Sequence, residues 1–238
     1  MDARALKELG LLEVASWYAV QAEAAAPGPV SEREDSAPPP APNRSAAATA
    51  GWEALRQLVV DCRACGLCRQ RKQAVFGVGA EAGPWLFVGE GPGADEDEQG
   101  EPFVGQAGRL LDNMLAAIGC RRGHDTYIAN VVKCRPPGNR TPTAEEAAAC
   151  APFLDRQIEL VAPKLIVALG RTAIVRLLGT EASVASLRGK VHRYRGIPVV
   201  VTYHPAYLLR SLAEKAKAWE DLVFARNTLR SALAGDPL

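Results

Sequence analysis

The chain has 238 residues, of which 48% are hydrophobic and 23% are charged, as in an ordinary globular protein. This length suits one large domain or two small ones, and no apolar run reaches the ~18 residues of a membrane-spanning helix. Seven acids and four bases give residues 1–50 a charge of −3, which leaves +4 for the rest of the chain. The bases there are clustered, and composition alone favours a solvated surface over contact with a polyanion.

The first fifty residues are expected to lie outside the folded domain. Leucines at helical spacing predict a helical segment over residues 1–23, and the acids among them are unlike a secretory signal. Residues 24–50 are rich in Pro, Ala and Ser and almost free of large apolar side chains, which predicts a disordered linker. The folded domain is therefore expected to span residues 51–238.

Strand-like and helix-like segments alternate from Gly51 onward, which implies parallel strands with helices on both faces and therefore an α/β fold. Thr143 and Glu146 form a capping box, which predicts the start of a long helix. The strands are expected at 85–89, 126–132 and 164–170, with a hairpin and a last strand over 189–205. The helices are expected at 107–119, 143–161, 171–179 and 214–234.

Polar loops follow three of these strands, at residues 89–103, 130–142 and 203–210. In such sheets ligands bind beyond the carboxyl ends of the strands, so the three loops are expected to share one crevice. The first loop, "GEGPGADEDEQGEPF", combines glycines that allow close backbone approach with six acids that repel phosphate. Those acids and Pro92 disfavour a dinucleotide-binding oxidoreductase. The expected ligand is therefore something other than phosphate.

Four cysteines are candidate ligands of a metal. Cys62 and Cys65 form a closely spaced pair, and Cys134 and Cys150 lie farther along the chain. Four thiolates suit a tetrahedral zinc or a four-iron cluster, and the spacing does not separate these two; unliganded core thiols are the third alternative. Two more cysteines are expected to be unliganded: Cys68 and Cys120.

Three residues near predicted strand ends are candidates for a binding pocket: Phe103, Asn130 and His204. Taken singly, each has an ordinary structural explanation, as core packing, a strand-end cap and a hydrogen-bonded histidine. Together they offer one aromatic face, one amide and one imidazole. This combination suits a planar heterocycle.

The stretches "GEGPGADEDEQGEPFVGQAGRLL", "YIANVVKCRPPGNR" and "VTYHPAYLLR", with the four cysteines, closely resemble the family 4 uracil-DNA glycosylases, iron–sulfur enzymes of bacteria and archaea. The resemblance runs from Trp52 to Leu229. It implies a three-layer αβα sandwich with a central four-stranded parallel sheet. The implied reaction is excision of uracil from DNA by hydrolysis of the N-glycosidic bond, which leaves an abasic site for base excision repair. The implied cofactor is a [4Fe-4S] cluster on Cys62, Cys65, Cys134 and Cys150.

The same resemblance assigns roles around a uracil that has been flipped out of the DNA stack. Gly89 and Gly91 let the main chain approach the base, Phe103 stacks on it, and Asn130 reads its edge. Cytosine reverses the polarity of that edge, which leaves buried groups unpaired at about 1–3 kcal/mol each. Two further side chains complete the uracil site: Glu96, which excludes the methyl group of thymine, and His204, which donates a hydrogen bond to O2.

His204 and Glu90 are the implied catalytic residues. His204 stabilises the negative charge that develops on the departing uracil. Glu90 positions water or stabilises the sugar cation. The remaining acids of this loop, Asp95, Asp97 and Glu98, are expected to be solvated and to have no chemical task.

Uracil-containing DNA, single- or double-stranded, is the implied partner. Phosphate contacts are expected from Arg135, Arg140 and Arg210, and Leu208 or Leu209 is expected to wedge into the gap left by the base, with core packing as the equal alternative. We expect a monomer in the prokaryotic cytoplasm, associated with the nucleoid, with no membrane contact. The N-terminal segment is a candidate contact for a repair or replication protein.

A binding module is the rival function, because some relatives of this family trap uracil-DNA covalently through a histidine in an extra loop. The corresponding stretch here, "KCRPPGNRTPTAEE", has neither a histidine nor an obvious insertion. The sequence therefore favours a glycosylase that releases its product.

Overall fold

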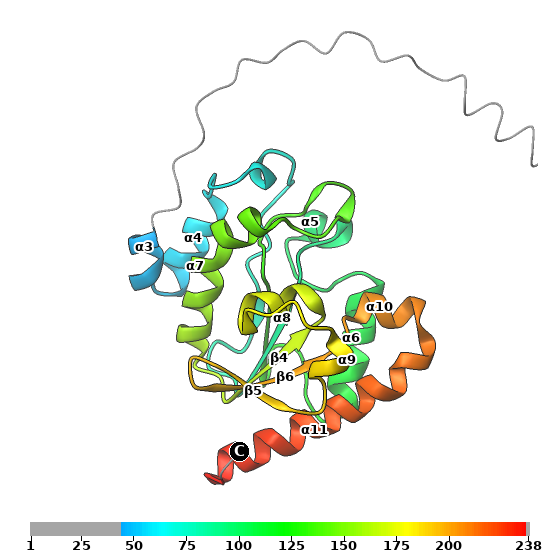
Figure 1. Ribbon diagram of the computed structural model, residues 1–238. Helices are drawn as coiled ribbons and strands as arrows, with labels where there is room; N and C mark the ends of the chain where they lie inside the picture. The colour runs from blue at the N-terminus through cyan, green and yellow to red at the C-terminus, as the bar shows by residue number, and fades with distance from the viewer. Residues whose placement is uncertain (1–43, 237–238) are drawn as a thin grey trace, which may run out of the picture. The chain divides into compact units, whose positions relative to one another are not determined.

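The computed structural model describes residues 44–236 (Figure 1). The helical segment expected at 1–23 and most of the expected linker lie outside these residues. The predicted end of the linker is wrong, because Arg44–Thr49 form the helix α3, in which Ala47 is fully buried. Alanine is the strongest helix former, and its small side chain allows α3 to pack closely on the helix α7, Ala144–Val161.

A six-stranded sheet forms the centre of the fold, in the order β1-β3-β2-β4-β6-β5. The four inner strands are parallel, as predicted. Two antiparallel edge strands, β1 and β5, extend the expected four-stranded sheet on either side. The strands are β1 Val78–Gly79, β2 Trp85–Gly89, β3 Thr126–Asn130, β4 Leu165–Leu169, β5 Val191–Tyr194 and β6 Ile197–Thr202.

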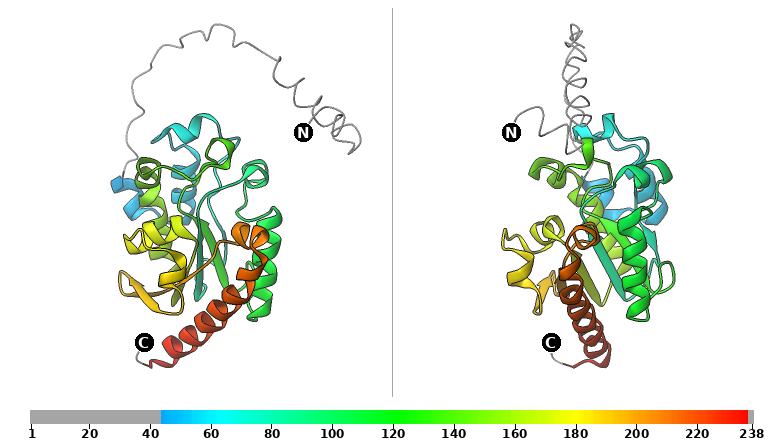
Figure 2. Two further views of the ribbon diagram at one scale, coloured as in Figure 1. Left: turned by 45° about the vertical axis from the view of Figure 1, so that its right-hand side comes forward. Right: turned by 90° about the vertical axis from the view of Figure 1, so that its right-hand side faces the viewer.

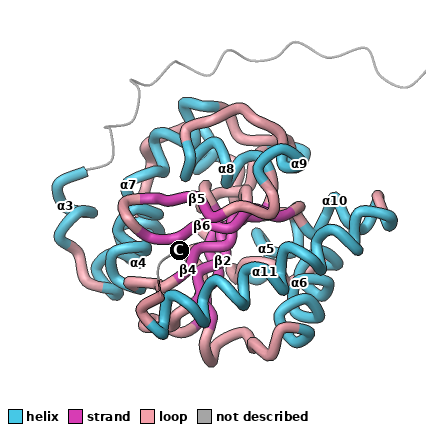
Figure 3. The backbone as a smooth tube through the Cα atoms, turned by 60° about the horizontal axis from the view of Figure 1, so that its bottom comes forward, coloured by secondary structure: helices cyan, strands magenta, loops and turns pink. Residues whose placement is uncertain are grey.

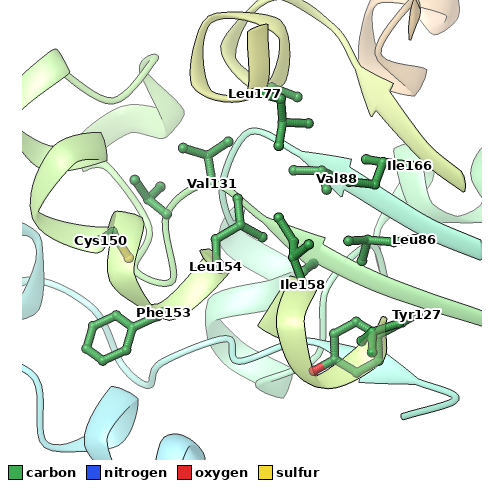
Figure 4. Close-up of a cluster of buried hydrophobic side chains, with 14 of the residues drawn as sticks. Leu86, Val88, Tyr127, Val131, Cys150, Phe153, Leu154, Ile158, Ile166 and Leu177 are labelled. Carbon is green, nitrogen blue, oxygen red and sulfur yellow. The ribbon is translucent and has the colours of Figure 1, made fainter. Parts of the chain in front are cut away.

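Helices cover both faces of this sheet and bury two separate sets of apolar side chains (Figure 3). On β2, Leu86 and Val88 face the first set, while Trp85 and Phe87 face the second, as the two-residue period of a strand requires. Figure 4 shows the first set, where Leu154 and Ile158 meet Leu86. The first face is covered by α4 Trp52–Val60, α7 Ala144–Val161 and α8 Arg171–Leu178, and the second by α6 Gln106–Ala117 and α11 Lys215–Ala234.

Two short helices occupy loops that the sequence analysis left without regular structure. Ala94–Gln99 form α5, which begins after Gly93, and Pro205–Arg210 form α10, which begins with a proline in its first turn. The helix α10 lies against α6 in both views of Figure 2. The remaining helical turns are η1 Gly66–Arg69, η2 Pro137–Asn139, α9 Val184–Leu187 and η3 Leu212–Glu214.

The capping box predicted at the start of α7 is confirmed. The Thr143 side chain accepts the backbone N–H of Glu146, and the Glu146 carboxylate accepts the backbone N–H of Thr143 at 2.8 Å. Within residues 44–236, no helix is long and apolar enough to cross a membrane.

Candidate functional site

A cavity of about 570 Å³ opens at the carboxyl edge of the parallel strands. Its walls come from the segments that follow β2, β3, β4 and β6, so the expected convergence of the three polar loops is confirmed. The register supports this geometry, because Gly89 at the end of β2 pairs with Asn130 at the end of β3. The walls include eight of the predicted site residues: Glu90, Gly91, Glu96, Phe103, Asn130, Arg140, His204 and Arg210.

Asn130 presents an acceptor that has no partner. Its side chain is 2% exposed, and its Oδ1 is buried without a hydrogen bond to any residue that the structure describes. A buried polar atom without a partner costs about 1–3 kcal/mol, so this position suits a ligand that brings a donor. Gly89 leaves the necessary room, because a Cβ there would lie 2.5 Å from Asn130 Oδ1 and 2.6 Å from Phe103 Cζ.

Phe103 is held in an unusual backbone conformation beside Asn130. Its backbone angle φ is 57°, a value that residues other than glycine rarely adopt. Arg122 holds the turn by donating to the carbonyl of Phe103 at 2.8 Å and to that of Pro102 at 2.7 Å. The turn also needs Gly108, since a Cβ there would be 1.8 Å from the Phe103 oxygen. Strain that the surroundings fix in this way is typical of functional sites.

His204 is fixed as a neutral donor. Its Nδ1 accepts the backbone N–H of Ala206 at 3.2 Å, so the proton of the neutral ring is on Nε2. Burial and, to a smaller extent, the charge of Arg210 lower the pKa of His204 to about 4, and the charge of Glu96 opposes the shift. The ring lies 5.5 Å from that of Phe103, centroid to centroid. At neutral pH, His204 therefore offers one N–H and no positive charge.

Glu90 has a partner that the sequence analysis did not identify. The hydroxyl of Thr172, in the first turn of α8, donates to Glu90 Oε2. No motif in the sequence marks Thr172, because it comes from the segment after β4, which carries no conspicuous polar run. The hydrogen bond fixes one carboxylate oxygen of Glu90 in the cavity wall.

Both carboxylate oxygens of Glu96 bind backbone amides. Oε2 accepts from Gly93 at 3.0 Å, and Oε1 accepts from Val104 at 2.9 Å and from Gly105 at 3.1 Å. Glu96 therefore joins the start and the end of the acidic loop while lining the cavity. Its expected contact with the ligand stays a prediction.

The expectation that Asp97 is solvated is wrong. Asp97 is 2% exposed, and both of its carboxylate oxygens accept the backbone N–H of Lys72, at 3.0 and 3.1 Å. The turn of α5 directs this side chain inward, whereas Asp95 and Glu98 are exposed as predicted. Asp97 therefore attaches the segment after Cys62 and Cys65 to the acidic loop.

The predicted phosphate-binding arginines differ in whether they already have a hydrogen-bond or ion-pair partner in the protein. Arg210 is exposed at the cavity wall and has no hydrogen bond or ion pair with the residues that the structure describes. Arg140 also lines the cavity, but it makes a two-pronged contact with Glu146 at 2.7 and 2.8 Å. Arg135 lies outside the cavity wall and donates to Asn139 at 2.7 Å.

Leu208 is buried, as the alternative of core packing predicts. It is 1% exposed and belongs to the apolar core beneath α10, because the helical turn points it inward. The adjacent Leu209 is 38% exposed. Of the two leucines considered as a wedge, Leu209 is therefore the one that is exposed at the surface.

A second cavity is lined by cysteines. Its walls hold all four predicted ligands and also Cys68, which is expected to be unliganded: Cys62, Cys65, Cys68, Cys134 and Cys150. Arg71 donates to Cys134 Sγ at 2.8 Å, and the backbone N–H of Lys133 donates to Cys150 Sγ at 3.3 Å. Burial raises the pKa of Cys134 to about 11 and that of Cys150 to about 12.

Comparison with known proteins yields one family and several close relatives. A model described as the uracil DNA glycosylase superfamily matches residues 76–223. The chain is 45% identical over 182 residues to the type-4 uracil-DNA glycosylase of Thermotoga maritima, covering 75% of this chain and 94% of that protein. It is 46% identical over 176 residues to the protein of the same name from Pyrobaculum aerophilum, covering 71% of this chain and 89% of the relative.

Proposed function

This chain belongs to the type-4 uracil-DNA glycosylases of the uracil DNA glycosylase superfamily, and we propose that it excises uracil from DNA and leaves an abasic site. The observation that carries the proposal is the buried, unpartnered Oδ1 of Asn130, in one cavity with Phe103 and His204. These groups match the acceptor, the stacking face and the donor that uracil requires.

Recognition begins when the base leaves the stack and enters the cavity. Asn130 Oδ1 accepts the N3–H of uracil, and its NH₂ group donates to O4. Cytosine has an acceptor at N3 and a donor at C4, so it leaves both groups of Asn130 unpaired at about 1–3 kcal/mol each. Phe103 supplies the stacking surface. Its constrained backbone keeps that surface in place before the base arrives.

Thymine is excluded at a rigid position of the wall. Thymine differs from uracil by a methyl group on C5, so discrimination requires a side chain that does not yield. The three backbone amides that bind the Glu96 carboxylate supply this rigidity. We propose that Glu96 lies beside C5 of the bound uracil.

Cleavage of the glycosidic bond leaves negative charge on uracil and positive charge on the sugar. The Nε2–H of His204 donates to O2 as the negative charge develops, and a preorganised donor of this kind typically contributes 10²–10³ in rate. Glu90, oriented by Thr172, stabilises the sugar cation or positions the attacking water. The two side chains therefore act on opposite ends of the breaking bond.

DNA is held at the rim of the cavity. Arg210 is the strongest candidate for a phosphate contact, since it has no partner among residues 44–236. Arg140 and Arg135 are further candidates that must exchange the contacts described above for phosphate. Leu209, exposed on the same helix as Arg210, is the candidate wedge.

We infer that Cys62, Cys65, Cys134 and Cys150 hold a [4Fe-4S] cluster. The fit is supported by four thiols around one cavity and by N–H donors to two of the sulfurs, which stabilise cluster-bound thiolates. When bound, the cluster would join the segment between α4 and η1, the segment after β3, and α7.

The cofactor assignment is checked on anaerobically purified protein by visible absorbance and by iron and zinc analysis. We expect a brown protein with about four irons per chain, the number that a four-iron cluster contains. Zinc without iron would contradict the assignment and restore the alternative that the cysteine spacing leaves open.

The activity is tested by incubating the protein with an oligonucleotide that contains one uracil, as a single strand and paired with guanine or adenine. Free uracil and an alkali-labile strand support the glycosylase. A denaturation-resistant adduct would instead support the covalent binding module, and unchanged DNA would refute both.

A further inference from the structure

Lys133 is a buried cation between the two cavities. Its side chain is 1% exposed, and Nζ donates to the carbonyl of Asn130 at 2.8 Å and to Gln157 Oε1 at 2.6 Å. Within residues 44–236, none of its contacts is an ion pair with an aspartate or glutamate. A buried ammonium without an anion costs several kcal/mol, so its place in the fold needs an explanation.

The cysteines offer the missing negative charge. Lys133 lines the thiol cavity, directly precedes Cys134, and donates its backbone N–H to Cys150 Sγ. Cysteines that bind a metal centre do so as thiolates. The proposed cluster site therefore places anionic sulfur beside the buried ammonium.

On its other side, Lys133 holds the main chain that carries Asn130. The edge strand β1 pairs with β3 at Tyr127 and Ile128, so Asn130 lies beyond the last residue that β1 reaches. At this point Lys133 Nζ, and not a backbone N–H of β1, donates to the Asn130 carbonyl. The contact therefore holds the main chain at the residue whose side chain enters the first cavity.

Gln157 limits where the ammonium can lie. It is fully buried on α7, and its Nε2 donates to the carbonyl of Phe76 at 2.8 Å and to the hydroxyl of Tyr127 at 3.2 Å. These two donations leave Oε1 directed at Lys133. The lysine is therefore clamped between the carboxamide of Gln157 and the end of β3.

We propose that Lys133 is a positioning residue whose charge is neutralised by the thiolates of Cys134 and Cys150 and whose ammonium fixes the end of β3 that carries Asn130. The inference rests on the proposed function. It links the cysteine site to uracil recognition through one side chain and involves no electron transfer.

The test compares Lys133→Met, which removes the charge and keeps the length, with Lys164→Met, an exposed lysine before β4. Both are purified anaerobically, and iron per chain is measured so that affinities refer to loaded protein. The probe is a strand with one non-hydrolysable 2′-fluoro-2′-deoxyuridine, against the same strand with thymidine. We expect Lys133→Met to lose about 10- to 100-fold in affinity for the uracil strand, as substitutions of supporting residues do, and none for the thymidine strand.

The proposal would be overturned if iron-loaded Lys133→Met bound the uracil strand as tightly as the control Lys164→Met does. If Lys133→Met does not fold or load iron, Gln157→Met decides, because it keeps the lysine and every cysteine but removes the Oε1 acceptor. If Gln157→Met loses affinity for the uracil strand alone, the proposal is supported. If its affinity for that strand is unchanged, the proposal is overturned. Failure of the unaltered protein to prefer uracil strands refutes the proposed function instead.

Discussion

His204 is kept neutral and oriented by its immediate neighbours. Its Nδ1 caps α10 through the N–H of Ala206, and burial lowers its pKa to about 4. A histidine that donates without being charged can stabilise an anion that forms during the reaction, and its donor is in place before the reaction starts. This one residue therefore fixes both the geometry and the pH range of the proposed activity.

Replacing His204 with alanine is expected to lower kcat on a uracil strand by about 10²–10³, because one preorganised donor is lost. In the unaltered protein, kcat should show no fall around pH 6.5 and should decline only toward pH 4, where protonation of Nδ1 removes the acceptor of the Ala206 N–H that orients the ring. Steady-state rates between pH 4 and pH 8 check both statements. A fall centred at pH 6.5 that His204→Ala abolishes would contradict the neutral-donor assignment.

The same pKa shift predicts how stability depends on pH. The unfolded chain takes up a proton at His204 near pH 6.5, whereas the folded chain does so only near pH 4. The unfolded state therefore binds more protons in this range, and the free energy of unfolding falls as the pH falls from 6.5 toward 4. Urea unfolding should show a weaker pH dependence in His204→Ala than in the unaltered protein.

Asn130→Asp is expected to weaken the discrimination between uracil and cytosine. A carboxylate accepts the amino group of cytosine and repels O4 of uracil, so discrimination should fall by about 10- to 100-fold for 1–3 kcal/mol per mismatched group. The measurement is kcat/KM on strands that differ only in uracil or cytosine. Asn113→Asp, on the exposed side of α6, is the matched control and should change neither value.

At the scale of elements, the short helix α5 joins the two halves of the site. Glu96 binds the ends of the acidic loop, and Asp97, one residue later, binds the backbone N–H of Lys72 in the segment after the paired cysteines. Neighbouring residues on one turn therefore fix two different segments. Of the acids expected to be solvated, Asp97 is the one that holds the loop in place.

Asp97→Asn is expected to destabilise the protein by about 1–3 kcal/mol, because it replaces a charged acceptor of a buried N–H by a neutral amide. Glu98→Gln, whose carboxylate is exposed in an ion pair with Lys72, should cost less than about 1 kcal/mol. Urea unfolding of iron-loaded protein measures both. Equal midpoints for the two variants would mean that the Asp97 contact does not hold the segment.

At the scale of the whole molecule, one sheet edge assembles groups that are far apart in the sequence. Phe103, Asn130 and His204 come from three separate segments and meet because parallel strands end together. The positive charge of residues 51–238 includes Arg140 and Arg210 at the rim of this cavity. The fold thereby places two arginines, the proposed phosphate contacts, in the wall of the cavity that holds Phe103, Asn130 and His204.

Arg210→Gln is expected to remove one phosphate contact. The slope of log K against log salt should then become shallower by about 1. Affinity should fall to a similar extent for uracil and thymidine strands. Arg230→Gln, on the exposed surface of α11, is the control. An unchanged slope for Arg210→Gln would remove this residue from the phosphate-binding set.

The sequence alone determined the parallel sheet, the long helices and their caps, because these follow from local periodicity and from short-range hydrogen bonds such as that between Thr143 and Glu146. It also placed Phe103, Asn130 and His204 at one edge, since strand order along the chain is enough to predict that the polar loops converge. The resemblance to a known family supplied their roles.

Only the tertiary structure decided which side chains are buried at short or irregular segments. Leu208 and Leu209 are adjacent leucines, and the turn of α10 alone makes one core and the other surface. Asp97 and Thr172 act through partners more than twenty residues away, and Lys133 is held by Gln157 over a similar separation, which no local pattern encodes. Contacts of this kind exist only once the sheet has brought distant segments together, because burial and pairing are properties of the assembled core.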